Sequence, residues 1–120
     1  MTEAIDRPDL APLSLFDTSP GNYSLILTDH HFAQAADLFE AVGQEASGYS
    51  WDAVAHTAVR VHAPELGDRI GGFDPEAGMM CVYGKDEAAL RELGSILSSA
   101  FHDRAKLSAL IEATDPGDWD

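Results

Sequence analysis

The sequence predicts an α+β fold: an antiparallel sheet of two β-hairpins, about four or more strands, with about four helices packed on it. Short segments rich in β-forming residues come in pairs separated by turn residues, at 13–17 with 22–29 and at 69–74 with 78–84. Each pair is followed by stretches in which apolar residues recur at helical spacing. The pattern of two strands and then helices therefore occurs twice.

The first hairpin closes at the turn Thr18–Gly21, where Pro and Gly favour a change of chain direction. Asp29 is placed to cap a helix over residues 30–46, which Gly43 or Gly48 would end. The apolar side chains on one face of this helix are Phe32, Ala36, Phe39 and Val42 or Gly43. This face is suited to pack against the sheet.

A second helix is predicted to start at Trp51, with Ser50 as its N-cap and Pro64 as the residue that stops it. Its inward face would contain Trp51, Val54, Ala55, Ala58, Val59 and His62. Trp51 is therefore expected to anchor this helix to the sheet.

The second hairpin closes at the turn Pro75–Gly78, and Asp86 is placed to cap a third helix over residues 87–101. The apolar face of this helix contains Ala89, Leu90, Leu93, Ile96, Leu97 and Ala100. A fourth helix over residues 104–114 would bury Leu107, Leu110 and Ile111. We expect a flexible acidic tail at 1–12, one α+β domain at 13–114 and an acidic C-terminal tail at 115–120.

The two halves of the chain match when the sequence is shifted by 57 positions without a gap. Four residues then meet identical ones: Phe16, Asp17, Gly21 and Asp29 meet Phe73, Asp74, Gly78 and Asp86. An internal ββα(α) repeat explains the match, and so does turn and cap chemistry that both halves share. In a true repeat each half has an apolar sheet face that it cannot bury alone, so the halves would pack together.

The strongest compositional feature is the charge: seven Lys and Arg residues against 21 Asp and Glu residues, a net charge of −14. Binding to nucleic acid or to an anionic membrane is not expected, because both depend on Lys and Arg. A positively charged protein partner would be attracted, although an acidic surface that serves only solubility explains the charge as well. The N-terminus lacks the basic and apolar parts of a signal peptide, which favours a cytoplasmic protein.

The residue types that carry catalysis or bind metals do not occur in functional spacings. The adjacent residues His30 and His31 point in different directions on a helix, and His56 and His62 do not have the i, i+4 spacing of a zinc helix. Cys81, the single cysteine, lies in a predicted strand and is expected to be a small buried residue in a reducing compartment. We therefore expect no catalytic residues, no metal, no cofactor and no enzymatic activity.

Four residues are candidates for contact with a partner protein. Tyr49 and Trp51 are aromatic residues of the kind that anchor protein interfaces, and Tyr49 lies in a link where it can be exposed. Asp74 and Glu76 flank the turn residue Pro75 and could also act as paired carboxylates. Turn chemistry is the simpler explanation for that pair.

Two segments, GYSW at 48–51 and FDPEAGMMCVYG at 73–84, resemble the immunity protein 51 family of bacterial polymorphic toxin systems. Members of that family look like small α+β proteins with a Gly-Tyr-x-Trp segment and a Phe-Asp-x-Glu-(Ala/Ser)-Gly-Met segment before an apolar strand. The matching positions here are Gly48, Tyr49, Trp51, Phe73, Asp74, Glu76, Gly78 and Met79. The resemblance covers roughly Leu13 to Ala100.

The resemblance implies a protein that binds a co-encoded toxin and blocks its active site. We expect it to be a monomer or a weak dimer. Many toxins of this kind are nucleases, whose basic clefts an acidic inhibitor can occupy as a phosphate mimic. The charge alone also allows an acidic adaptor or a DNA-mimic inhibitor of a host nucleic-acid-binding protein, with negative charge along a ridge. A third hypothesis is a small enzyme that uses Asp74, Glu76 and a histidine in a concave pocket.

Overall fold

A computed structural model of the chain describes residues 3–5 and 10–119. The elements follow one another as β1 (Glu3–Ile5), β2 (Ser14–Ser19), β3 (Asn22–Thr28), the 3₁₀ helix η2 (Asp29–Ala35), α1 (Ala36–Glu40), α2 (Gly48–His62), the 3₁₀ helix η3 (Pro64–Asp68), β4 (Gly72–Phe73), β5 (Met79–Gly84), α3 (Glu87–Phe101), α4 (Arg104–Ala113) and the 3₁₀ helix η4 (Pro116–Trp119). The predicted α+β class, with an antiparallel sheet and four α-helices, is confirmed.

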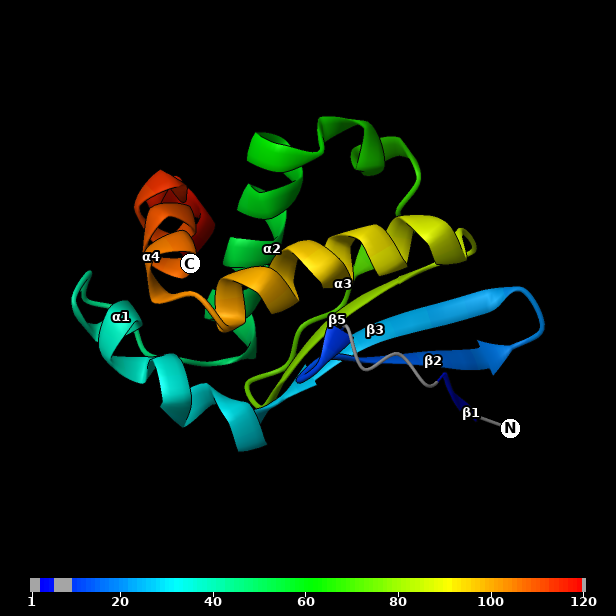
Figure 1. The fold of residues 1–120 in the computed structure, drawn as a ribbon, viewed down its shortest axis with the longest axis horizontal. Coiled ribbons are helices and arrows are strands. Elements are labelled where there is room, and N and C mark those ends of the chain that lie inside the picture. Colours follow the sequence, from blue (N-terminus) through cyan, green and yellow to red (C-terminus); the bar gives the residue numbers. More distant parts are fainter. Residues whose placement is uncertain (1–2, 6–9, 120) are drawn as a thin grey trace.

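The sheet has five antiparallel strands in the order β1-β2-β3-β5-β4, so the second strands of the two hairpins are neighbours at its centre. They pair from Tyr23 opposite Gly84 to Thr28 opposite Met79. Figure 1 shows α2, α3 and α4 together on one side of this sheet. None of the described helices is long and apolar enough to cross a membrane.

Alternation along the strands separates a covered face from an open one. The covered face carries the buried side chains Leu15, Leu25, Leu27, Met80 and Val82. The residues between them point away from the helices and form what we call the open face: Ser14, Phe16, Ser24, Ile26, Thr28, Met79, Cys81 and Tyr83. The sheet therefore buries one side only, as antiparallel sheets commonly do.

Aromatic side chains fill the core beyond the sheet. Trp51 is fully buried and packs on Phe39 and Phe101, with ring centroids 5.4 and 6.1 Å away. Trp119 packs edge-on against Phe39 at 6.1 Å, so the segment predicted as an acidic tail contributes a side chain to the fold. The indole N–H of Trp51 has no hydrogen-bond partner among the described residues. Trp51 therefore contributes to the core through the volume of its apolar ring.

The two termini depart from the prediction. The chain was expected to be a flexible tail as far as residue 12, but residues 3–5 form β1 against β2, and Leu10 is buried beside Leu25 and Gly94. Residues 1–2 and 6–9 of that predicted tail lie outside the described residues, as does Asp120. Three residues are too few to show a strand period, which explains why the sequence did not reveal β1.

The predicted first helix is largely 3₁₀, and two predicted caps are wrong. Thr28, not Asp29, is the residue before η2, and its side chain makes no cap hydrogen bond. The chain turns after α1 at Gly43, whose φ of +80° suits glycine. The N-cap of α2 is Ser47, because Ser50 sits three positions later and completes a capping box with it.

The second half follows the prediction closely. Asp86 caps α3 by accepting a hydrogen bond from the N–H of Ala89, and α3 covers the predicted residues 87–101. Asp103 caps α4 by accepting hydrogen bonds from Ala105 and Lys106. Pro64 starts η3 directly after α2 ends.

The order of elements agrees with the 57-residue repeat, since β2-β3-α1-α2 is followed by β4-β5-α3-α4. Leu25 and Val82, which are 57 positions apart, lie opposite each other in the central strand pair. Thr57 and Thr114, also 57 apart, meet through their buried hydroxyls at 2.8 Å between α2 and α4. Each hydroxyl also contacts the carbonyl four residues before it, Ala53 or Leu110. Equivalent positions of the two halves are therefore in contact both within the sheet and between the helices.

This threonine pair gives a stability prediction. Thr57→Val leaves the Thr114 hydroxyl with its bond to Leu110 alone, so we expect a loss of about 1–2 kcal/mol in the free energy of unfolding. The double variant T57V/T114V removes both hydroxyls and should cost no more than the single one. Urea denaturation of the two single variants and the double variant measures the coupling. Strictly additive losses of unfolding free energy in the double variant would show that the two hydroxyls are not coupled.

Candidate partner-binding surface

The two segments that carry the family resemblance meet in space. Gly48, the first residue of α2, lies against the turn that joins β4 to β5, and its N–H donates to the carbonyl of Ala77 at 2.8 Å. A methyl group on Gly48 would lie 1.8 Å from the carbonyl oxygen of Glu76 and 2.3 Å from that of Met79. Only glycine permits this approach. The close contact fixes the start of α2 to the β4–β5 turn.

The same turn is held from a second side. Glu76 and Met79 exchange two backbone hydrogen bonds across it, and the N–H of Asp29 donates to the carbonyl of Gly78 at 3.0 Å. The turn is thus tied both to α2 and to the end of β3. Side chains that project from it are therefore presented from a fixed backbone.

The structure places the four candidate contact residues in different environments. Tyr49 is 53% exposed at the start of α2, and Asp74 and Glu76 are exposed on the β4–β5 turn. Trp51 is fully buried, so its assignment as a partner contact is corrected: it holds α2 in the core. Tyr49, Asp74 and Glu76 are thus available at one place, around the contact of Gly48.

His56 lies next to this surface, on the third turn of α2. Its ring stacks on Phe73 with centroids 3.8 Å apart, and its Nε2 lies 3.4 Å from Asp52 Oδ2. The hydrogen bond that His56 donates to Asp52 raises the pKa of His56; burial works against this, and the charges of Asp52 and Asp118 add to it. His56 therefore keeps its positive charge to higher pH than a free histidine.

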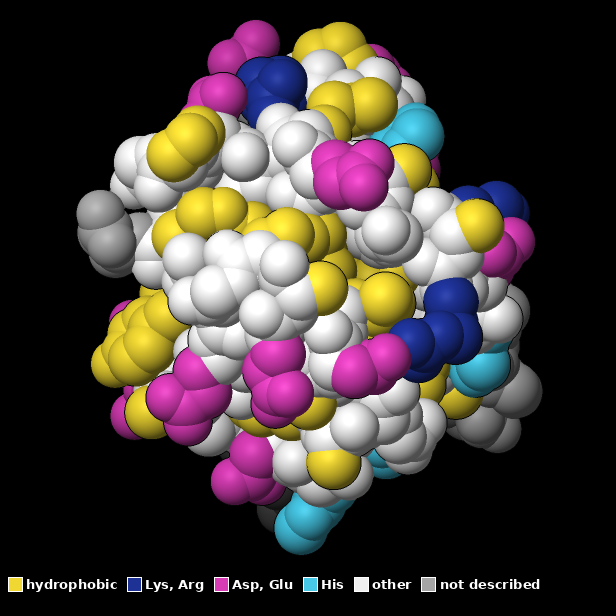
Figure 2. Space-filling model, turned by 90° about the vertical axis from the view of Figure 1, so that its left-hand side faces the viewer, with side chains coloured by type: hydrophobic (Ala, Val, Ile, Leu, Met, Phe, Trp, Pro, Cys, Tyr) yellow, Lys and Arg dark blue, Asp and Glu magenta, His cyan; other side chains and the backbone are white. Residues whose placement is uncertain are grey.

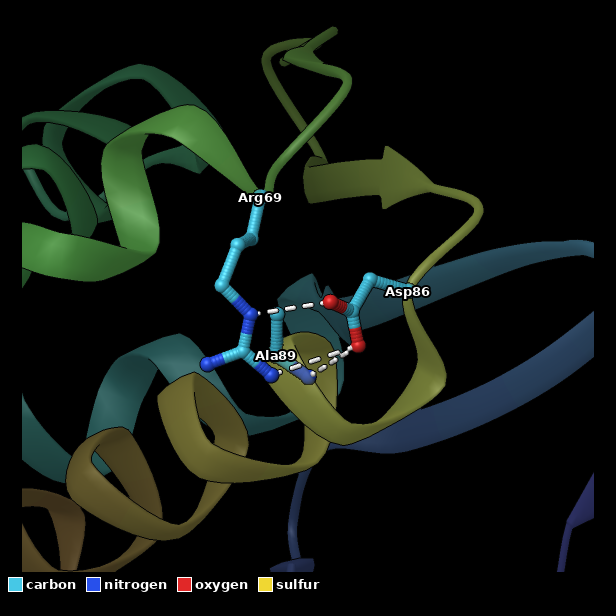
Figure 3. Close-up of polar contacts among 3 residues, drawn as sticks. All are labelled: Arg69, Asp86 and Ala89. Atoms are coloured by element: carbon cyan, nitrogen blue, oxygen red, sulfur yellow. Dashed lines mark hydrogen bonds and ion pairs between the residues drawn. The ribbon is translucent and has the colours of Figure 1, made fainter.

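A recess of about 1100 Å³ reaches from the open face around the end of the sheet. Its walls include Tyr23, Tyr83 and Cys81, together with the charged residues Arg69 and Asp86. Figure 3 shows how Arg69 and Asp86 are joined: the guanidinium donates to both carboxylate oxygens, and the N–H of Ala89 donates to one of them. The hydrogen bond from Arg69 lowers the pKa of Asp86.

The recess does not bring together the two carboxylates and the histidine of the enzyme hypothesis. Asp74 lines it, but Glu76 and the histidines are not among its lining residues. Burial in the sheet, with Asp74 and Glu76 nearby, raises the pKa of the Cys81 thiol, which disfavours the reactive thiolate. Within residues 3–5 and 10–119, no three His, Cys, Asp or Glu side chains are placed to hold a metal ion. The hypothesis of a carboxylate–histidine enzyme is not supported by this geometry.

Ion pairs neutralise only part of the negative charge of the protein. Arg69, Arg91 and Arg104 form ion pairs with Asp86, Glu87 and Asp37. Figure 2 shows the end of the molecule near α1 and α4, where the few Lys and Arg side chains each stand next to an acidic one and further Asp and Glu side chains spread over the face. Three of the six described Lys and Arg side chains are thus in ion pairs with Asp or Glu, and the excess charge of the chain is negative.

The tight contact at Gly48 predicts a large effect of a small change. Gly48→Ala should lower the free energy of unfolding by at least about 2 kcal/mol, because the methyl group meets backbone carbonyls that have no room to move. Gly67→Ala is the control, since a methyl group there meets nothing within 4 Å. Thermal and urea unfolding of both variants check this. Equal stability of the two variants would show that the turn is free to shift.

The raised pKa of His56 predicts a pH-dependent term in stability. The ion pair with Asp52 stabilises the folded state fully below the unfolded pKa of about 6.5 and is lost as the pH rises through the higher folded pKa. Since the His56 side chain is 47% exposed, the term should stay below about 1 kcal/mol. Asp52→Asn should lower the pKa of His56 and remove the term. NMR titration of the His56 ring and urea unfolding at several pH values, in the wild type and in Asp52→Asn, measure both.

Comparison with known proteins assigns the family. The family model described as Immunity protein 51 matches residues 13–116, which contain both hairpins and the four α-helices. No match was found among curated proteins or among solved structures. The matched range extends past the resemblance seen in the motifs, because it includes α4 and the start of η4. Since the family model spans most of the chain, this protein belongs to the Immunity protein 51 family.

Proposed function

We propose that this chain is an immunity protein that binds a co-encoded bacterial toxin domain and occludes the active site of that toxin in the cytoplasm. The family match over residues 13–116 is the observation that carries the proposal. It supports an immunity function in general, and the charge and the surface support the nature of the partner.

The partner is proposed to present a basic surface. A net charge of −14 attracts a cationic protein and raises its association rate, most strongly at low salt, where screening is weak. A toxin whose active site is a basic cleft, as in a nuclease, fits this charge. The surface around Gly48 offers the contacts: Tyr49 as an aromatic anchor, with Asp74 and Glu76 as carboxylates for Lys or Arg of the toxin.

The alternative, a DNA-mimic inhibitor or acidic adaptor, predicts negative charge arranged along a ridge. On the face in Figure 2 the acidic side chains are spread out and interrupted by hydrophobic ones. That arrangement suits a protein interface better than an imitation of a phosphate backbone.

The proposal is tested by rescue of toxin-expressing cells. Co-expression of this chain should restore the growth of cells that produce the toxin domain encoded next to it, and the purified proteins should form a stoichiometric complex. If growth is not restored and no complex forms, the proposal is wrong.

A charge-reversal variant tests the surface. D74K/E76K should reduce the association rate with the toxin at least about tenfold at low salt and weaken its salt dependence, since two lysines would repel the basic cleft that the two carboxylates attract. E40K/E112K changes the net charge equally at two exposed positions on α1 and α4. Stopped-flow association at several salt concentrations compares the two. The same loss in both variants would show that only the total charge matters.

A further inference from the structure

The open face of the sheet carries an apolar centre. Reading across β2, β3 and β5, one row contains Phe16, Ser24 and Tyr83, and the next contains Ser14, Ile26 and Cys81. All eight open-face residues are uncharged in a chain with 21 acidic residues. Tyr83 is 44% exposed. A neutral surface of this extent stands out on such an acidic protein.

These apolar side chains do not serve the core. Phe16, Ile26, Met79 and Tyr83 are half-buried or exposed, and none belongs to the hydrophobic cluster or packs against it, whereas Phe73 does. The helices α2, α3 and α4 lie on the other side of the sheet (Figure 1). Folding therefore gains little from these apolar side chains, and they are free to contact another molecule.

A β-bulge places Phe16 on this face. Both hairpins contain the dipeptide Phe-Asp at repeat-equivalent positions, but the register of the first shifts between Asp17 and Ser19. Phe16 therefore lies opposite Ser24 on the open face, while its counterpart Phe73 lies opposite the buried Val82 and stacks on His56. The bulge leaves one residue of β2 without a partner on β3, and this shift turns the ring of Phe16 outward. Bulges are known to redirect side chains in this way at functional surfaces.

The border of this face on the β4 side is acidic. The N–H of Asp74 donates to the carbonyl of Cys81, and Glu76 pairs with Met79, so both carboxylates project on the side of the open face. The recess lined by Tyr83, Cys81 and Asp74 opens at the same place. The open face and the acidic turn thus form one continuous surface with an apolar centre and a charged border, the usual anatomy of a protein interface.

We propose that the toxin docks on the open face, with apolar side chains over Phe16, Ile26 and Tyr83 and with cationic side chains against Asp74 and Glu76. This inference rests on the proposed function and names the surface that performs it. A second copy of the chain is the less suitable occupant, because two bodies of charge −14 repel each other and would bring no cations to the acidic border.

The size of the face sets what the toxin must cover. With strands about 4.8 Å apart and same-face residues about 7 Å apart, the three rows over β2, β3 and β5 measure roughly 130 Å² between the outermost residues. A stable complex buries about 800 Å² on each partner. The toxin must therefore extend beyond the apolar centre, and the β4–β5 turn with Tyr49 lies directly at its border.

The test replaces two apolar residues at the centre of the open face by threonine, which is less apolar but still favours a β-strand. F16T/I26T should weaken binding of the co-encoded toxin domain at least tenfold, as expected for central interface residues. V42T/V61T makes a similar change at two apolar residues that are 41% and 46% exposed outside the sheet, and it should stay within twofold of the wild type. Calorimetric titration gives the Kd, and thermal unfolding verifies that both variants fold.

A second measurement uses the unmodified protein. In the complex, hydroxyl-radical oxidation of Met79 and Tyr83 should slow at least threefold, while Val61 and His62 at the end of α2 keep their rates. If the wild type binds the toxin but F16T/I26T binds equally well and Met79 stays reactive, the docking surface is wrong and the immunity function stands. If the wild type neither binds the toxin nor protects cells, both proposals fall.

Discussion

The pairing of β3 with β5 is the interaction on which the structure depends. It is the only link between the two hairpins within the described sheet, and it places Leu25 opposite Val82 under the helices. Because alternate residues point to opposite sides, this single register decides which side chains enter the core and which stay outside. The covered face of Leu25, Leu27, Met80 and Val82 and the open face with Ile26 and Cys81 are set together by the same six residue pairs.

The motif segments are meaningful because they are in contact. Because Gly48 has no side chain, α2 can start directly on the β4–β5 turn, and this brings Tyr49 close to the turn that carries Asp74 and Glu76. Trp51, two residues after Tyr49, points inward to Phe39 and Phe101. One short segment thus anchors the helix and presents an aromatic ring to solvent, a division that follows from the 100° rotation per residue of a helix.

How much of the fold could be predicted depended on the length of each pattern. Helix α3 was predicted to the residue because Asp86 and fifteen periodic residues agree with each other. The start of α2 was misplaced since Ser47 and Ser50 both belong to one capping box and either could be taken for the cap. Strand β1 and the packing of Trp119 lie in short segments without a period, where only tertiary contacts define the structure.

The candidate surface was predictable only in part. Tyr49, Asp74 and Glu76 could be proposed from residue type and turn position, and the structure finds them exposed. The outward position of Phe16 could not be predicted from the sequence. Phe16 and Phe73 are each followed by Asp, and each lies near the end of the first predicted strand of its hairpin. Their difference comes from one shifted pairing near Ser19, a feature of the hydrogen-bonded sheet that residue types do not encode.

The hydroxyl contact between Thr57 and Thr114 has an evolutionary consequence. Two equivalent atoms that meet each other are what a symmetric dimer has on its rotation axis. A chain of this form is what results when the gene for such a dimer is duplicated and fused. Fusion frees each half from carrying every substitution twice, so one hairpin could shift its strand pairing by one residue at unchanged length, and a surface for an unlike partner could arise on one copy alone.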